Sequence, residues 1–137
     1  MEYRDAKAAT EPIPKETDRV SHQVVDAAFA VHVALGPGLI ESVYEACLVH
    51  ELQQRGCKAE RQVLLAVVYR NLRLDAGLSL DLVVERRVVV ELKALEAILA
   101  VHKAQLLTYL KLSGYRLGLL INFNSVLIKN GIHRITL

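Results

Sequence analysis

Between Gln62 and Leu95 the sequence is dominated by Val and Leu, and this block separates two regions of different pattern. "QVLLAVVY" and the two apolar segments of "SLDLVVERRVVVELKAL" are short, β-branched runs, which is typical of strands that are covered on both faces. "RNLRL", between them, is interpreted as a turn and a short strand. The block therefore predicts strands inside a sheet, with helices available to cover it.

The flanking regions supply those helices. Apolar residues recur at helical spacing from Val20 to Leu35, where "GPG" ends the pattern, and again from about Leu39 to Gln54, before Gly56. "LAVHKAQLLTYLKLSG" returns to helical spacing and is expected to end at Gly114. Two helices before the strands and one after them indicate an α/β domain.

The C-terminal region is predicted to return to strands. "YRLGLLINF" has the composition of a buried strand, and "SVLIKNGIHRITL" is interpreted as a final hairpin that turns at Asn130-Gly131. The predicted fold is a single α/β domain with a central mixed sheet flanked by helices, in the order helix, helix, three strands, helix, strand and C-terminal hairpin.

Length and composition fit this organisation. The 137 residues suit one domain, which we place at residues 20–137, and the charged segment 1–19, with two prolines, is expected to be a flexible leader. No segment resembles a signal peptide or approaches the ~20 apolar residues of a membrane span, and Cys47 is expected to be a buried, reduced thiol, so we predict a cytoplasmic protein. The formal net charge of +2 permits a nucleic-acid partner but does not by itself indicate one.

Three polar residues interrupt the Val-rich strands: Asp81 in the first segment, and Glu91 and Lys93 in the second. Because side chains alternate along a strand, Glu91 and Lys93 point to the same face. A two-residue turn at Arg86-Arg87 would place Asp81 opposite Leu92, whereas a three-residue loop would place it opposite Glu91. The local sequence leaves both registers open, because a three-residue loop usually contains a left-handed residue such as Gly and none is present.

If the two acids converge, they suggest a metal site. Paired carboxylates repel each other, and a hard divalent cation such as Mg²⁺ or Mn²⁺ relieves that repulsion. Lys93 would then face the same centre and could stabilise negative charge on a phosphate. The alternative is that the acids are solvated positions near strand ends, since so short a pattern occurs in many proteins.

Two further polar groups lie on the predicted helices. Glu41 and Glu45 stack at a spacing of four on the second helix, beside Tyr44. On the third helix, a polar stripe opposite Leu107 and Leu110 is formed by His102, Gln105 and Tyr109. Such side chains beside a sheet can reach a phosphate or a bound water, or they can mark an ordinary boundary between helix and solvent.

Several of these residues lie in a motif that can be compared with a known family. "LGPGLIESVYEACLVHEL" resembles the signature of the bacterial GxxExxY proteins, with Gly38, Glu41 and Tyr44 at the named positions. The resemblance continues through "DLVVERRVVVELKALE" and "VHKAQLLTYLKLSGYRLGLLINFN" to "GIHRI". This family is placed in the PD-(D/E)xK nuclease-like superfamily, which includes restriction enzymes and Holliday-junction resolvases. The resemblance therefore implies a restriction-endonuclease-like core.

The resemblance also implies roles for the polar residues. Asp81, Glu91 and Glu41 would be the acids that bind Mg²⁺ or Mn²⁺, and Lys93 would support the attack of water on a phosphodiester. We expect the substrate site to be lined by Gln105, Tyr109, His102 and Tyr44. The implied function is a metal-dependent nuclease that acts on DNA, and so small a domain cannot readily enclose a duplex alone, which favours a homodimer. The alternative is a catalytically silent module that binds nucleic acid or a protein partner.

Overall fold

The computed structural model describes residues 11–137, so the first ten residues of the predicted leader lie outside the described part of the chain. The elements, in chain order, are α2 (Lys15–Leu35), α3 (Glu41–Gln54), β1 (Ala59–Tyr69), β2 (Leu72–Val84), β3 (Val88–Lys93), α4 (Ala100–Ser113), β4 (Leu117–Asn122), the 3-10 helix η1 (Ile128–Gly131) and β5 (Ile132–Thr136). None of the described helices combines the length and the apolar character that crossing a membrane requires.

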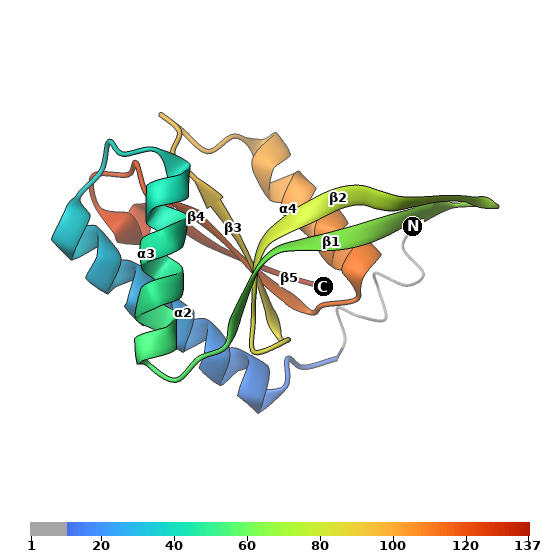
Figure 1. Cartoon of the computed structure of the whole chain (residues 1–137), viewed down its shortest axis with the longest axis horizontal. Coiled ribbons are helices and arrows are strands. Elements are labelled where there is room, and N and C mark those ends of the chain that lie inside the picture. The colour runs from blue at the N-terminus through green and yellow to red at the C-terminus, as the bar shows by residue number, and fades with distance from the viewer. Residues whose placement is uncertain (1–10) are drawn as a thin grey trace.

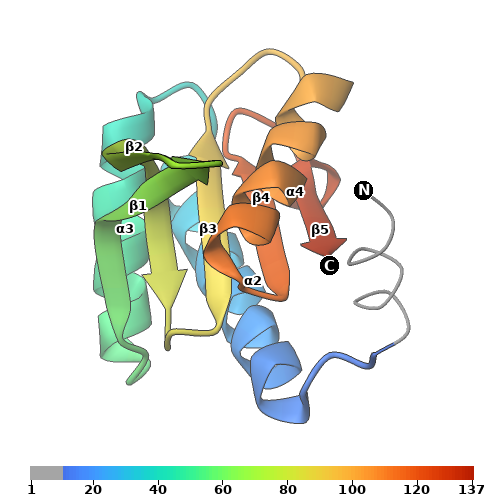
Figure 2. The same cartoon turned by 90° about the vertical axis from the view of Figure 1, so that its right-hand side faces the viewer.

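The five strands form one mixed sheet in the order β1-β2-β3-β4-β5 (Figures 1 and 2). The β3–β4 pair is parallel and is connected through α4, whereas the other neighbouring pairs are antiparallel. The α/β prediction is confirmed, and the structure agrees with a restriction-endonuclease-like core.

Helices cover both faces of the sheet, as the Val-rich strands require. On one face α2 and α3 pack on a buried cluster that includes Leu82, Val88 and Val90. On the other face α4 contributes Leu106 and Leu110 to a cluster with Val83, Val89 and Leu120. The sequence predicted Leu107 and Leu110 on the apolar side of this helix. The prediction is wrong for Leu107, because the two buried residues are Leu106 and Leu110.

Helix boundaries follow local chemistry. Helix α2 begins at Lys15, directly after Pro14, and not at Val20. Proline is well tolerated at a helix start, and the acids Glu16 and Asp18 in the first turn interact favourably with the helix dipole. The predicted end of α4 is confirmed, because Gly114 adopts a left-handed conformation with φ 84° and caps the helix.

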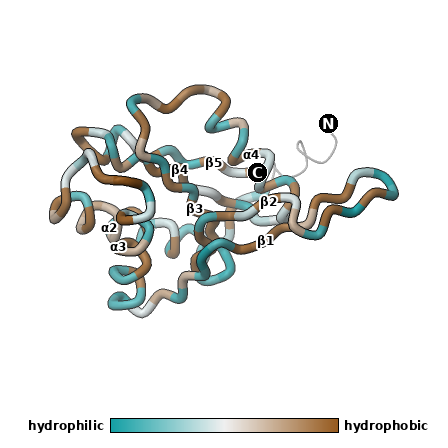
Figure 3. Tube along the Cα trace, turned by 45° about the horizontal axis from the view of Figure 1, so that its top comes forward, coloured by the Kyte–Doolittle hydropathy of each residue, from teal (hydrophilic) through white to brown (hydrophobic). Residues whose placement is uncertain are grey.

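The β1–β2 hairpin extends well beyond the sheet (Figure 1). "RNLRL" is not a separate short strand: β2 runs without a break from Leu72 to Val84, and Arg70 and Asn71 form the turn at the tip. We call residues 66–76 the arm. No residue of the arm belongs to either buried cluster, and Figure 3 shows hydrophobic and hydrophilic positions mixed along it.

The predicted C-terminal hairpin is not formed. Asn130 and Gly131 lie within η1, and β5 pairs with β4 across the intervening loop. Neither residue has the positive φ that a type I′ turn requires. Instead Ile128 is buried in the cluster on the α2–α3 face, and the apolar residues directly after Ser125 form no strand.

Candidate functional site

The β2–β3 hairpin has the register that brings the two acids together. Leu82 pairs with Val90 and Val84 with Val88, so residues 85–87 form a three-residue loop and the same register places Asp81 opposite Glu91. Of the two registers left open by the sequence, the structure contains the one that forms the acid pair.

The loop achieves this without glycine. Glu85 and Arg86 both have φ 53°, and the Arg87 N–H donates to the Val84 carbonyl over 2.9 Å, which is the pattern of a type I′ turn. Lys58, which directly precedes β1, stabilises this conformation through its backbone. Its carbonyl accepts the Glu85 N–H (2.8 Å), and its N–H donates to the Glu85 carboxylate (2.6 Å). Contacts outside the hairpin therefore determine the register.

Asp81 and Glu91 lie where β2 and β3 separate. The ladder of paired residues between β2 and β3 ends at Leu82–Val90, and beyond it side chains replace the backbone acceptors. The Glu91 carboxylate accepts the Asp81 N–H over 2.9 Å, and the Asp81 carboxylate accepts the Leu92 N–H over 2.9 Å. We call this reciprocal arrangement the carboxylate fork. It holds two acids face to face on adjacent strands.

The fork is short of positive charge. Glu91 is 5% exposed, and its burial, together with the neighbouring Asp81 carboxylate, raises its pKa to about 8. Burial also raises the pKa of Asp81, with a further contribution from Glu45. Lys93 lowers the pKa of both acids but does not compensate for burial. A cation placed between the carboxylates would favour their ionised forms.

Glu41, in the first turn of α3, shares this electrostatic environment. Burial raises its pKa, Asp81 and Glu45 raise it further, and Lys93 opposes them. Among residues 11–137, however, no three His, Cys, Asp or Glu side chains converge closely enough to hold a metal ion. As the side chains lie, the three predicted ligands do not form one shell. The fork itself still suits Mg²⁺, which commonly uses one or two carboxylates and keeps several waters.

Helix α4 presents two of the predicted polar residues to the fork. Tyr109 is half-buried, and its pKa is raised by burial and then by the negative charges of Glu91 and Asp81. The Gln105 side chain, which is exposed, forms a hydrogen bond with Tyr109. The structure therefore brings Tyr109 near both acids, with Gln105 beside it.

One comparison with known proteins identifies a family for this chain. A model of the PD-(D/E)XK nuclease superfamily matches residues 18–135, a span that includes the whole fork, α3, α4 and most of α2. The chain belongs to the PD-(D/E)XK nuclease superfamily. No curated protein and no solved structure gave a significant match. Membership supports a nuclease-like function, and nucleases of this superfamily generally depend on a divalent metal. The narrower GxxExxY assignment stays a prediction.

Two residues predicted to line the substrate site of this superfamily member have structural positions instead. Tyr44 is completely buried. Its hydroxyl donates to the Gly36 carbonyl (2.6 Å) and accepts the Leu39 N–H (3.1 Å). Its ring stacks on that of Phe123, with 4.6 Å between the ring centroids. His102 accepts the Leu99 N–H at Nδ1 over 2.8 Å and so caps α4. The prediction is wrong for Tyr44, which anchors the α2–α3 connection, and His102 already uses one ring nitrogen for the helix.

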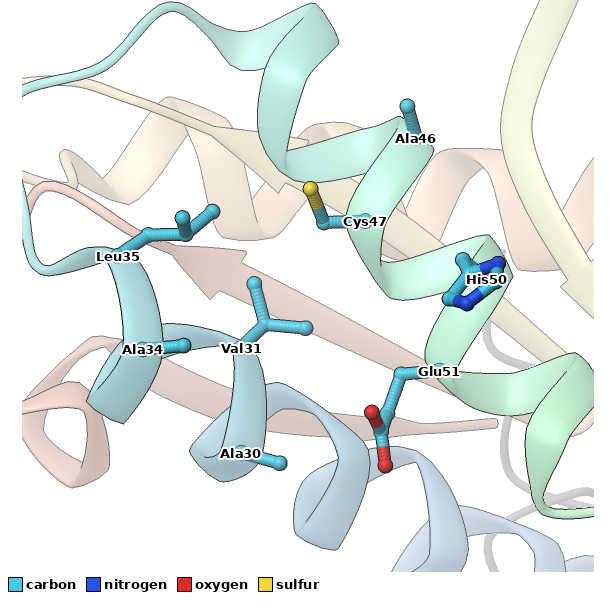
Figure 4. A pocket seen from close by; sticks show the side chains of 8 residues that line it. All are labelled: Ala30, Val31, Ala34, Leu35, Ala46, Cys47, His50 and Glu51. Carbon is cyan, nitrogen blue, oxygen red and sulfur yellow. The ribbon is translucent and has the colours of Figure 1, made fainter.

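A cavity of about 300 Å³ lies between α2 and α3, apart from the fork (Figure 4). Its lining is mainly apolar and includes Cys47, which is only partly buried, contrary to the sequence prediction. Asp81, Glu91 and Glu41 do not line this cavity. The buried thiol is that of Cys57, which donates to Gln23 over 3.3 Å.

Sequence reasoning missed a network beside the fork. Glu45 is 8% exposed, and its carboxylate accepts hydrogen bonds from Arg61 (2.9 Å) and Gln62 (3.0 Å). The stacking of Glu41 and Glu45 drew attention to both acids, yet their surroundings differ, because Glu45 has cationic and amide partners on β1. The local sequence "ERQV" contains no pattern that distinguishes Gln62 from an ordinary polar residue on a strand.

Proposed function

We propose that this protein is a metal-dependent nuclease that hydrolyses phosphodiester bonds of DNA, with Asp81 and Glu91 as the direct ligands of Mg²⁺ or Mn²⁺. The carboxylate fork carries this proposal, because the buried Glu91, with a pKa of about 8, and the half-buried Asp81 lie opposite each other and form a site that binding of a cation would stabilise.

Each residue near the fork has a proposed role. Asp81 and Glu91 bind the cation, and Glu41 contacts its water shell from α3. When bound, the metal lowers the pKa of a water and stabilises charge on the phosphate. Lys93 lies on the same face of β3 as Glu91, where its ammonium orients the attacking water or neutralises the phosphate. Tyr109 and Gln105 position the phosphate from α4.

The DNA substrate and the homodimer are also part of the proposal. Superfamily membership supports a nucleic-acid partner, and the net charge of +2 is compatible with one. A second copy would extend the surface available to a duplex.

Hydrolysis of branched, single-stranded and duplex DNA in Mg²⁺ or Mn²⁺ tests this function. We expect Asp81→Asn and Lys93→Met to lose cleavage while remaining folded, and Asp26→Asn, an exposed acid on α2, to cleave like the wild type. Wild-type activity in both Asp81→Asn and Lys93→Met would contradict the assignment. So would the absence of cleavage on every substrate in either metal.

One observation favours the alternative, a catalytically silent module. Both fork carboxylates accept backbone N–H groups at the point where the ladder ends, so they also serve a structural purpose. A silent module would bind DNA or a protein with an affinity that neither EDTA nor Glu91→Gln changes. Metal-dependent binding of DNA, by contrast, would favour the nuclease.

A further inference from the structure

Gln62 has a backbone conformation that is unusual for a strand. It lies in β1 between the pairs Arg61–Leu82 and Val63–Leu80, so the same register places it opposite Asp81. Its φ is 49°, in the left-handed region that residues other than glycine rarely adopt. No chain reversal occurs here, so the conformation has no turn to explain it.

The distortion also affects β2. Leu80 packs in the cluster beneath α4, whereas Leu82, two positions along, packs in the cluster beneath α2 and α3. In a regular strand these two side chains would share a face. The change of face in β2 therefore falls at Asp81, which lies opposite Gln62 in β1.

The side chain of Gln62 uses this position to contact three polar groups. Its Nε2 donates to Glu45 over 3.0 Å, its Oε1 accepts the Ser79 hydroxyl over 2.9 Å, and its side chain forms a further hydrogen bond with Asp81 that lowers the pKa of that acid. Carboxylates only accept, so the amide nitrogen must face Glu45 and Asp81, and the amide orientation is determined.

Glu45 explains why an amide is suited to this position. Its buried carboxylate raises the pKa of Asp81, so a second acid at residue 62 would add to the repulsion. An amide can bond two carboxylates at once without adding charge. Arg61, which donates to Glu45 over 2.9 Å, gives that carboxylate a cationic partner on β1.

We propose that Gln62 is a positioning residue for the metal site, which orients the Asp81 carboxylate for the cation and keeps Glu45 out of the ligand set. This inference rests on the proposed function, because it assigns Gln62 to the same site. Partners that orient a metal ligand typically change metal affinity by about 10- to 100-fold when they are removed.

The variant Gln62→Gly distinguishes the effect of the Gln62 side chain from the effect of its backbone conformation. Glycine adopts φ 49° without strain, so this variant keeps the local backbone and removes only the amide. Arg70→Gly is the matched control: Arg70 has φ 54° in the turn at the tip of the same hairpin, just beyond the end of β1 that is remote from the fork. Asp81→Asn serves as the reference for loss of the site.

The measurements are Mn²⁺ affinity by isothermal titration calorimetry and thermal unfolding in EDTA, neither of which needs a substrate. We expect Gln62→Gly to weaken Mn²⁺ binding about 10- to 100-fold while the protein still unfolds cooperatively in EDTA. Arg70→Gly should match the wild type in Mn²⁺ affinity.

The outcomes distinguish the two proposals. Wild-type Mn²⁺ affinity in Gln62→Gly, with affinity lost in Asp81→Asn, would overturn the role of Gln62 and leave the metal site intact. A folded wild-type protein that binds no Mn²⁺, or binds it equally in Asp81→Asn, would overturn the metal site and with it the inference. Equal weakening in Gln62→Gly and Arg70→Gly would show a general effect of the hairpin and would also reject the inference.

Discussion

Replacing Glu91 by Gln should make the protein more stable above pH 8, although Glu91 is almost completely buried and hydrogen-bonded. The folded state raises the pKa of this carboxyl from 4.5 to about 8, so the folded protein holds a proton that the unfolded chain releases. Between these two values the unfolded state binds fewer protons, and the free energy of unfolding falls as pH rises. The stabilising contribution is complete below pH 4.5 and is lost above pH 8.

The magnitude follows from the two pKa values. A change from 4.5 to about 8 corresponds to a loss on the order of 5 kcal/mol across this window. That is a large part of the ~5–15 kcal/mol that stabilises a typical domain. Gln cannot ionise, its carbonyl can still accept the Asp81 N–H, and its amide can donate to the Asp81 carboxylate. The variant should therefore avoid most of this loss.

Urea unfolding of both proteins in EDTA, at intervals from pH 4.5 to 9, measures the difference directly. Burial and then Lys103 lower the pKa of His133, so its contribution to the free energy of unfolding is lost as pH falls. This contribution is the same in both proteins and cancels when they are compared. Parallel pH profiles for wild type and Glu91→Gln, or a variant that is less stable at pH 8.5, would refute the reasoning. At pH 8.5 Mg²⁺ at 100 times its dissociation constant should restore ~2.7 kcal/mol to the wild type and less to the variant.

Two substitutions and one replacement of a segment test the structure around the site. Tyr44→Phe removes two buried hydrogen bonds and should lower the free energy of unfolding by about 1–3 kcal/mol in urea, with Mn²⁺ affinity unchanged. Gly118→Ala places a methyl group 2.9 Å from a Leu106 methyl carbon and should cost about 1–3 kcal/mol in the same assay, unless α4 shifts freely. Replacing the arm, residues 66–76, by a short turn should leave the unfolding temperature within a few degrees, because the arm adds nothing to either buried cluster; a large fall would contradict this.

The elements that the sequence predicted correctly are those whose pattern is long and is reinforced by packing. Helices α3 and α4 have apolar stripes and end near glycine, and β3 is buried on both faces, so pattern and environment agree. The face shared by Glu91 and Lys93 followed from alternation alone. Superfamily resemblance supplied the remaining assignments, including the pairing of Asp81 with Glu91.

The errors arose where local pattern and tertiary environment diverge. The arm has no core to cover it, so its polar and apolar residues carry no consistent period and "RNLRL" was interpreted as a separate element. Asn130-Gly131 is a strong hairpin signal in isolation, but burial of Ile128 favours a 3-10 turn at that point. Tyr44 matched a motif position, and only the structure shows that its hydroxyl bonds the Gly36 carbonyl and the Leu39 N–H.

The register at "ERR" shows most clearly what the sequence could not determine. Two consecutive residues other than glycine in the left-handed region cost on the order of 1–2 kcal/mol each, so local energetics disfavour the observed loop. Hydrogen bonds from Lys58 to Glu85, and from Arg87 to Thr17 on α2, offset that cost, and their partners lie 27 and 70 positions away. A regular two-residue turn would move Asp81 opposite Leu92 and separate the acids. The proposed metal site therefore depends on contacts at the far end of the hairpin, which form only when α2 and the start of β1 are in place.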